Sequence, residues 1–247
     1  MFDLTNKTIL LTGAGKGIGK DILEKLQKYN LIIYAIVKSK NDIKKITPNK
    51  NLYIINGDIT NKKCITKVFN LIKKNKHRLD CLINNAGIRQ RKKFLKINEK
   101  DLNFVFKNNF FSLFNLTQQF VKQFKFKKNH GSIINISSIV GELGFNELSG
   151  YASSKSAING LTKCLAIELA KDKIRVNSIA PGFIKSSFYK KFKRDKKKLY
   201  NWTLSRTPSN KWGELSDVSD LVVFLLSDNS KYINGQILKI DGGWTSA

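Results

Sequence analysis

The sequence predicts a single α/β domain in which helices cover both faces of a doubly wound parallel sheet. Short apolar runs without polar alternation recur along the chain, as in strands that are buried on both faces. Segments with a helical spacing of apolar residues separate these runs, as crossovers between parallel strands require. A length of 247 residues suits one domain of this class, and no repeat or Pro/Ser-rich linker divides the chain.

About seven strands are predicted, and each except the last is followed by a turn or a helical segment. We expect strands at Lys7–Thr12, Leu31–Val37, Asn51–Asn56, Cys81–Ile83, Ser132–Ile136, Arg175–Ile179 and Gln236–Ile240. The clearest helical patterns cover Lys16–Asn30, Asp101–Phe126, Tyr151–Ala170 and Asp217–Leu226. This alternation is typical of a parallel sheet enclosed between two layers of helices.

The chain is strongly basic. It carries 45 Lys and Arg against 18 Asp and Glu, a formal net charge of +27. Such a balance can indicate nucleic acid, an anionic membrane or an acidic small molecule as partner. However, Lys, Asn, Ile and Phe have codons rich in A and T, and biased nucleotide usage explains lysines that are spread over many segments. Only Lys190–Lys198 is a dense run. We therefore expect no nucleic-acid binding and keep a non-catalytic, basic nucleic-acid-binding protein as a remote alternative.

Several classes of site are disfavoured. The opening residues lack the basic and apolar regions of a secretory leader, and no uncharged run approaches the roughly 18 residues of a membrane span. Cys64, Cys81 and Cys164 are odd in number and far apart, and neither His77 nor His130 has a neighbour at metal-ligand spacing. We expect a cytoplasmic protein without membrane span, disulfide framework or metal.

A glycine-rich turn joins the first predicted strand to the first predicted helix. Residues 12–19 read Thr-Gly-Ala-Gly-Lys-Gly-Ile-Gly, which fits TGxxxGxG and not GxGxxG. Glycines allow the backbone to approach a pyrophosphate, and the N-terminus of the following helix offers unpaired N–H groups to it. We therefore predict a dinucleotide site formed by Gly13, Gly15, Lys16, Gly17, Ile18 and Gly19.

The end of the second strand bears on the type of dinucleotide. An acidic side chain there would accept hydrogen bonds from the adenosine ribose and repel a 2′-phosphate. The sequence has Val37-Lys38-Ser39-Lys40 at this point and no acid. Because Lys16 in the glycine turn adds a second cation, we expect NADP(H) rather than NAD(H).

Four further motifs follow in order. They are Asn84-Asn85-Ala86-Gly87, Ser137-Ser138, Tyr151-Ala152-Ser153-Ser154-Lys155 and Pro181-Gly182. Together with the glycine turn, this set resembles the short-chain dehydrogenase/reductase family over essentially the whole chain. The resemblance implies a Rossmann-type fold with seven parallel strands, one NAD(P)-binding catalytic domain over residues 1–247, and a homotetramer.

The candidate catalytic residues also have a chemical logic of their own. Tyr151 and Lys155 stand four apart in a helical segment and so share a face. A phenol has an ordinary pKa of about 10, and a nearby ammonium brings it toward the working range. By resemblance, Ser138 binds the substrate oxygen, and Asn109 supports a water that relays protons to Lys155. The adjacent Asn108 is the alternative if the alignment shifts by one residue.

The resemblance carries further cofactor contacts onto this chain. Lys155 would hold the nicotinamide ribose, Asp58 would lie by the adenine, and the backbone N–H of Ile184 would reach the carboxamide. The contacts expected in addition to the glycine turn are Lys38, Asp58, Ile59, Asn84, Ala86, Gly87, Tyr151, Lys155, Pro181, Gly182, Ile184 and Ser186.

Two readings of the substrate compete. The stretches 84–91, 202–213 and 241–244 resemble gluconate 5-dehydrogenases and 2-deoxygluconate 3-dehydrogenases, and Arg89 or Arg91 could bind a carboxylate. The alternative is a 3-oxoacyl-acyl-carrier-protein reductase, but the residues before Tyr151 lack the Gln and Asn common there. Its acidic carrier would meet Lys127, Lys128, Lys171 and Lys173. We expect hydride transfer on a sugar-acid or polyol-type secondary alcohol or ketone, and an anionic substrate would suit the basic residues near the site.

The stretch 185–212, the lid segment below, falls where the family has its mobile substrate lid. Its aromatic residues, with Phe183 just before it, would cover the site while its lysines attract an anion. The open alternative is a solvated basic helix with its aromatics in the core. The aromatic residues concerned are Phe183, Phe188, Tyr189, Phe192, Tyr200 and Trp202.

Overall fold

A computed structural model describes residues 2–124, 130–187 and 189–247. The described residues form one sheet of seven parallel strands in the order β3-β2-β1-β4-β5-β6-β7, which confirms the predicted fold class. The strands are β1 (Thr8–Thr12), β2 (Ile32–Val37), β3 (Leu52–Asn56), β4 (Cys81–Asn84), β5 (Gly131–Ile136), β6 (Ile174–Pro181) and β7 (Ile237–Ile240).

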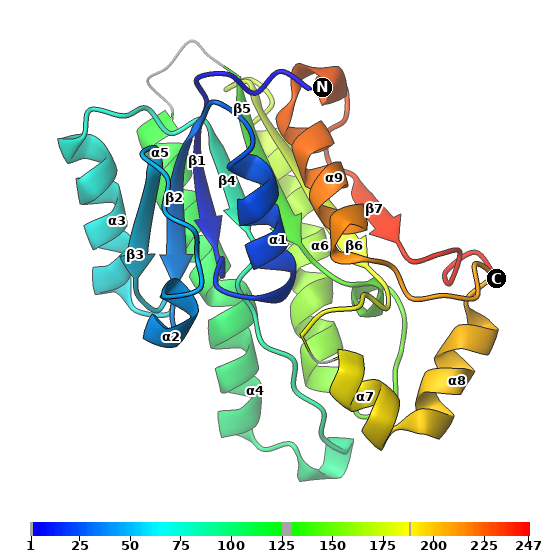
Figure 1. Ribbon diagram of the computed structural model, residues 1–247. Helices are drawn as coiled ribbons and strands as arrows, with labels where there is room; N and C mark the ends of the chain where they lie inside the picture. The colour runs from blue at the N-terminus through cyan, green and yellow to red at the C-terminus, as the bar shows by residue number, and fades with distance from the viewer. Residues whose placement is uncertain (1, 125–129, 188) are drawn as a thin grey trace.

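Helices pack on both faces of this sheet (Figure 1). The α-helices are α1 (Gly17–Leu26), α2 (Lys40–Ile43), α3 (Lys62–Lys74), α4 (Glu99–Phe106), α5 (Ser112–Phe124), α6 (Ser149–Glu168), α7 (Tyr189–Asp195), α8 (Lys197–Arg206) and α9 (Leu215–Leu226). Short 3₁₀ turns are η1 (Phe94–Lys96), η3 (Ile139–Gly141) and η4 (Asp228–Ser230), and a π-helical turn, η2 (Lys107–Phe111), joins α4 to α5.

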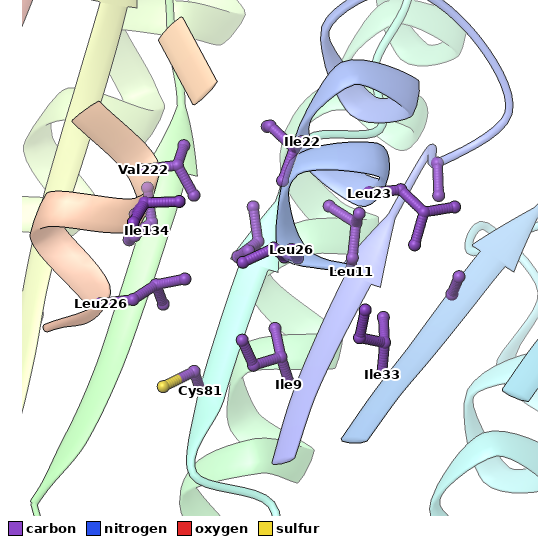
Figure 2. Packing of buried hydrophobic residues seen from close by; sticks show 14 of the residues in the cluster. Ile9, Leu11, Ile22, Leu23, Leu26, Ile33, Cys81, Ile134, Val222 and Leu226 are labelled. Atoms are coloured by element: carbon purple, nitrogen blue, oxygen red, sulfur yellow. The ribbon is translucent and has the colours of Figure 1, made fainter. Parts of the chain in front are cut away.

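The core has one layer on each side of the sheet because successive strand residues point to opposite faces. Ile9 and Leu11 of β1 pack with Leu23 of α1 and Val222 of α9 on one face (Figure 2). Leu10, between them in the sequence, belongs to the opposite layer. Five consecutive buried residues in β1 therefore serve both layers, which is why the strand reads as an unbroken apolar run.

The second layer lies under α3, α5 and α6. Phe69 of α3 and Phe120 of α5 pack there against strand residues such as Leu82 and Ile133. Helical spacing places the buried residues of each helix on one face, as in α3, where Ile65, Val68, Phe69 and Ile72 are buried.

The predicted helix over residues 101–126 is interrupted. The chain forms α4 from Glu99, then η2, then α5 to Phe124, and residues 125 and 126 lie outside the described part. The helix begins earlier than predicted because Asn98 caps it in a capping box with Asp101. The π-helical turn adds a residue to one helical turn, and Asn109 is buried within it.

The other helical predictions hold with shifted ends. Lys16 is extended, so α1 starts at Gly17, and it ends at Leu26, before the predicted Asn30. Helices α6 and α9 each begin two residues before their predicted starts. Within the described residues, no helix combines the length and apolar character that a bilayer span requires.

The carboxyl ends of the strands meet at one edge, and α4, α7 and α8 extend beyond it (Figure 1). The order of the strands reverses between β1 and β4, where open α/β sheets form their binding crevice. Thr12 joins the two ends there. Its hydroxyl donates to Ile83 O at 3.3 Å and accepts from Asn85 N and Ala86 N, each at 3.0 Å.

Candidate active site

Two adjoining cavities open at this edge of the sheet. The first, about 250 Å³ and here called the tyrosine cavity, is lined by Ser138, Tyr151, Lys155 and Arg89. The second, about 600 Å³ and here called the glycine cavity, is lined by the glycine turn and the ends of β2 and β3. Both are lined by Ile18, Asn85, Gly87, Ile88 and Ser186, so together they form one continuous site.

Tyr151 and Ser138 reach the tyrosine cavity from two different elements. Tyr151 stands in the first turn of α6, and Ser138 follows β5 directly. Burial raises the pKa of the Tyr151 phenol, while the positive charge of Arg89 and a hydrogen bond with Ser138 act in the opposite direction. In this state of the protein the phenol therefore holds its proton at neutral pH and is able to donate it.

Lys155 is a buried cation one turn after Tyr151. Its Nζ lies 5.8 Å from the centroid of the Tyr151 ring and donates to Ile136 O at 2.8 Å. No carboxylate forms an ion pair with it in the described part of the chain. Burial consequently lowers the pKa of Lys155 to about 8. When protonated, the Lys155 ammonium favours a negative charge on Tyr151. Because its pKa is about 8, Lys155 can also exchange a proton near neutral pH.

Asn109 holds the loop after β4 in place. Its carboxamide accepts from Ile88 N at 2.8 Å and donates to Ile88 O and to Ser154 Oγ, each at 3.0 Å. A Cβ on Gly87 would lie 3.2 Å from Asn109 Oδ1 and 3.7 Å from Lys155 Nζ, so the three residues are neighbours. Asn108 instead donates to Phe104 O. The structure thus places Asn109 beside Lys155, and its part in a proton relay stays a prediction.

The glycine cavity fits a dinucleotide. Gly13 has φ +68°, and a Cβ on it would come within 2.8 Å of Ala86 Cα. A Cβ on Gly19 would overlap Gly13 O. The first turn of α1 contains no acidic side chain that would compete with a phosphate for its N–H groups. Glycine is therefore required at positions 13 and 19 for the turn to pack closely against itself and against the segment after β4, and the N-terminus of α1 lines the glycine cavity, where a pyrophosphate would bind.

The predicted cofactor residues line these cavities with one exception, Asn84. Its side chain is 3% exposed and donates to Thr117 Oγ1 at 3.1 Å and to Asn135 Oδ1 at 2.9 Å. As the last residue of β4, it points between the sheet and α5 instead of into the crevice. This corrects its expected placement on the adenosine side. Asn85, which the sequence reasoning did not single out, lines both cavities and donates to Thr12 O and Gly13 O.

The adenosine end of the glycine cavity holds acids as well as lysines. Lys38 Nζ lies 2.7 Å from Asp58 Oδ2. Asp42 also lines the cavity, and a Cβ on Gly15 would lie 2.9 Å from its Cβ. The sequence reasoning missed Asp42 because it stands five residues after β2. The short helix α2, capped by the Ser39 hydroxyl, turns it back toward Gly15.

The lid segment contains α7 and α8. Rings of Tyr189, Phe192 and Tyr200 lie 5.2 to 5.4 Å from that of Trp212, so these aromatics pack among themselves. This favours the alternative in which they belong to the core. Phe183 lines the tyrosine cavity, as expected if aromatic residues of this region cover the site. Phe188 lies outside the described residues, as do Lys127 and Lys128, and movement of the segment stays a prediction.

No group of three or more His, Cys, Asp or Glu side chains with a geometry for metal binding occurs among the described residues.

Known proteins resemble the chain over nearly its whole length. A family model described as enoyl-(acyl carrier protein) reductase matches residues 13–245. The chain is 35% identical to the 3-oxoacyl-[acyl-carrier-protein] reductase FabG of Thermotoga maritima, over 97% of this chain and 98% of the relative. It is also 35% identical to the 2-dehydro-3-deoxy-D-gluconate 5-dehydrogenase of Bacillus subtilis, over 99% of this chain and 97% of the relative.

Two solved structures show the same fold with nicotinamide cofactors. 4-Hydroxyisoleucine dehydrogenase complexed with NADH superimposes with a TM-score of 0.92 at 31% identity, covering 98% of this chain and 100% of that one. ElxO with NADP bound has a TM-score of 0.90 at 30% identity, with the same coverage.

The buried charge of Lys155 predicts a pH-dependent stability. The ordinary pKa of 10.5 applies in the unfolded chain, whereas the folded pKa is about 8. Below pH 8 both states bind the proton and folding bears the full cost of a buried cation. Between pH 8 and 10.5 the folded state releases it first, so the cost falls as pH rises. We expect Lys155→Met to raise the free energy of unfolding by about 2 kcal/mol at pH 7, the lost hydrogen bond to Ile136 offsetting part of the gain.

Chemical denaturation of wild type and variant between pH 7 and 10 measures this difference. It should shrink as pH rises. Lys163→Met, an exposed lysine on the same helix, is the matched control and should show no such trend. A stability difference for Lys155→Met that stays constant over this range would contradict the assignment of a buried, weakly held proton.

Proposed function

Because the chain belongs to the short-chain dehydrogenase/reductase family, we propose that it transfers a hydride between NADP(H) and a secondary alcohol or ketone of a sugar-acid or polyol-type substrate. The chain is an oxidoreductase that acts on CH–OH groups and uses a nicotinamide cofactor. The choice of NADP(H) and of the substrate class is the proposal. The observation that supports it most is the convergence of Ser138, Tyr151, Lys155 and Arg89 on one cavity next to the glycine turn.

Each of these side chains has a distinct part in the reaction. The bound nicotinamide supplies or accepts the hydride. The Tyr151 hydroxyl gives a proton to the substrate oxygen in reduction, the Tyr151 phenolate removes that proton in oxidation, and Ser138 holds the oxygen by a hydrogen bond. Lys155 stabilises the phenolate that Tyr151 becomes. The cofactor would be held by the glycine turn, by Asp58 and Asn85, and by the segment after β6.

A polar, anionic substrate is supported by the walls of the tyrosine cavity. Arg89 presents a guanidinium to the same space as Tyr151, and its charge acts on the phenol. A guanidinium binds a carboxylate through two parallel hydrogen bonds. Relatives named for 5-keto-D-gluconate and 2-dehydro-3-deoxy-D-gluconate, at 34% and 35% identity, agree with such a substrate.

A 3-oxoacyl-acyl-carrier-protein reductase is the second candidate. The similarity to FabG of Thermotoga maritima favours it. The carrier protein is acidic, and Lys171 and Lys173 follow the end of α6, where they could meet it. The two candidates share the same catalytic side chains and differ only in what the rest of the substrate contacts.

The preference for NADP(H) is supported by the cations at the adenosine end. Lys16 and Lys38 both line the glycine cavity and both are exposed there. Asp58 engages Lys38 and Asp42 stands nearby, so a 2′-phosphate has to attract Lys38 away from Asp58.

We also propose a homotetramer in the cytoplasm. The surface of α4, η2 and α5 exposes Phe104, Phe111 and Phe114, with exposed fractions of 56%, 50% and 36%. Adjacent exposed aromatics on one pair of helices support contact with another copy of the chain. The three cysteines are all free, as in a reducing compartment.

Tyr151→Phe should lower the turnover number by about 10²- to 10⁴-fold, because only the proton-transferring hydroxyl is removed. Dinucleotide affinity should change little. The assay follows NAD(P)H absorbance with sugar acids, polyols and acetoacetyl thioesters compared side by side. Tyr232→Phe, at a fully exposed tyrosine, is the control. Wild-type rates in Tyr151→Phe would refute the mechanism, and a preference for acetoacetyl thioesters would select the second candidate.

Lys38→Ala should lower the ratio of kcat/KM for NADP to that for NAD by about 10-fold or more, since it removes a charged hydrogen bond to the 2′-phosphate. Lys40→Ala is the matched control, because Lys40 starts α2 but does not line the cavity. A wild-type enzyme that uses NAD as well as NADP would overturn the cofactor proposal.

The tetramer predicts a solution mass of four times the 28.1 kDa chain. Phe104→Lys should dissociate it, because a buried charge at a helix–helix contact is unfavourable. Light scattering after size-exclusion chromatography measures both. A wild-type mass equal to one chain would rule the assembly out.

A further inference from the structure

A third cavity, of about 380 Å³, lies next to the tyrosine cavity and is here called the arginine–tryptophan cavity. Phe145 lines both cavities and so forms a shared wall. The arginine–tryptophan cavity is lined by Arg91, Leu143, Gly144, Phe145, Asn146, Leu199, Trp202, Arg206 and Trp244. These residues come from the loop after β4, the segment after β5, helix α8 and the C-terminal turn.

Aromatic rings form its walls. Phe145 stacks on Trp244 with centroids 5.8 Å apart, and Trp202 meets the same indole edge-on at 5.5 Å. Trp244 is buried at 2% exposure, whereas Trp202 is 46% exposed. Mutual packing fixes these rings, so the shape of the cavity is formed before any ligand enters.

Two arginines supply its charge, and none of the lining residues is acidic. The Arg206 guanidinium lies 5.2 Å from the Trp244 ring centroid, a cation–π contact that orients it. Arg91 Nη1 lies 3.5 Å from Glu147 Oε2, a long ion pair between partly exposed groups. The cavity thus presents two positive charges, and no lining residue carries a negative charge to balance them.

We propose that the arginine–tryptophan cavity binds an anionic group, carboxylate or phosphate, at the end of the substrate remote from the reacting carbon. Arg89 lines the tyrosine cavity, and Arg91, two residues later, lines this one. A single molecule that passes Phe145 therefore meets a guanidinium on each side. The inference rests on the proposed function, because the reacting end of that molecule occupies the tyrosine cavity.

The chemistry selects an oxyanion with several acceptor atoms. Arginine forks pair with carboxylate or phosphate oxygens through two hydrogen bonds, which lysine does not reproduce. The buried indole of Trp244 forms one side of the cavity and holds the Arg206 guanidinium in place. A sugar acid with a terminal phosphate, or a dicarboxylic hydroxy acid, has this pattern of charge.

The test compares gluconate with 6-phosphogluconate by isothermal titration calorimetry. Saturating NADPH is present, so that the glycine cavity is occupied and cannot bind the phosphate, and the reduced cofactor cannot oxidise the alcohol probes during the titration. We expect the wild-type protein to bind the phosphorylated probe about 10- to 100-fold more tightly. Arg206→Gln and Arg91→Gln should each reduce this ratio to about 3-fold or less. Arg206→Lys, which keeps the charge but not the fork, should give an intermediate ratio.

Lys93→Gln is the matched control, since Lys93 is an exposed cation two residues after Arg91, lies outside the lid segment and lines none of the three cavities. It should leave both affinities unchanged. The inference would be overturned if the wild type bound gluconate and 6-phosphogluconate equally well, or if it did not measurably bind 6-phosphogluconate. It would also be overturned if the ratio of the two affinities were unchanged in both Gln variants.

Hydride transfer is assayed separately and distinguishes the two levels of the proposal. A wild-type enzyme that oxidises unphosphorylated sugar acids but shows no phosphate preference leaves the proposed function intact and removes only this cavity's assignment. An enzyme that oxidises neither sugar acids nor polyols removes the proposed function, whatever the calorimetry shows.

Discussion

The hydroxyl of Thr12 is the constraint on which the site depends. It is buried at the end of β1 and bonds one backbone group within β4, Ile83 O, and two in the segment that follows, Asn85 N and Ala86 N. The two segments come from opposite sides of the point where the strand order reverses. Asn85 adds two further bonds back to the glycine turn. The floor of the crevice is therefore a hydrogen-bonded unit, and Asn85 from this unit lines both cavities.

The second constraint is the burial of Lys155 without a carboxylate partner. An acid beside it would stabilise the ammonium, but it would also cancel the positive charge that the proposed mechanism places next to Tyr151. Among the described residues, Nζ instead donates to the neutral carbonyl of Ile136. The burial of this charge therefore costs folding free energy at a position where the proposed mechanism uses the charge.

Much of the fold and of the catalytic set could be predicted from the sequence. Strands buried on both faces have an unambiguous apolar pattern, and Tyr151 and Lys155 share a helical face by spacing alone. Asn84 and Asn85 show what the sequence does not determine. Adjacent residues at a strand end point in opposite directions, and the sequence pattern does not tell which of the two faces the crevice. Asp42 is a second residue whose position the sequence does not reveal, since it reaches Gly15 through the folded turn of α2. The interruption at Asn109 was not predicted because apolar residues such as Phe106, Phe110 and Phe111 occupy several helical faces around it, so the shift in register that the extra residue causes is hidden in the sequence pattern.

The distribution of tryptophan has a practical consequence. The chain has three tryptophans, Trp202, Trp212 and Trp244, and all of them lie after residue 200. Trp212 packs with the aromatics of the lid segment, while Trp202 and Trp244 pack with Phe145. The first five strands contain no indole at all. Intrinsic tryptophan emission therefore reports on this one region and is blind to the first half of the sheet, so a rearrangement around α7 and α8 has an optical signal of its own.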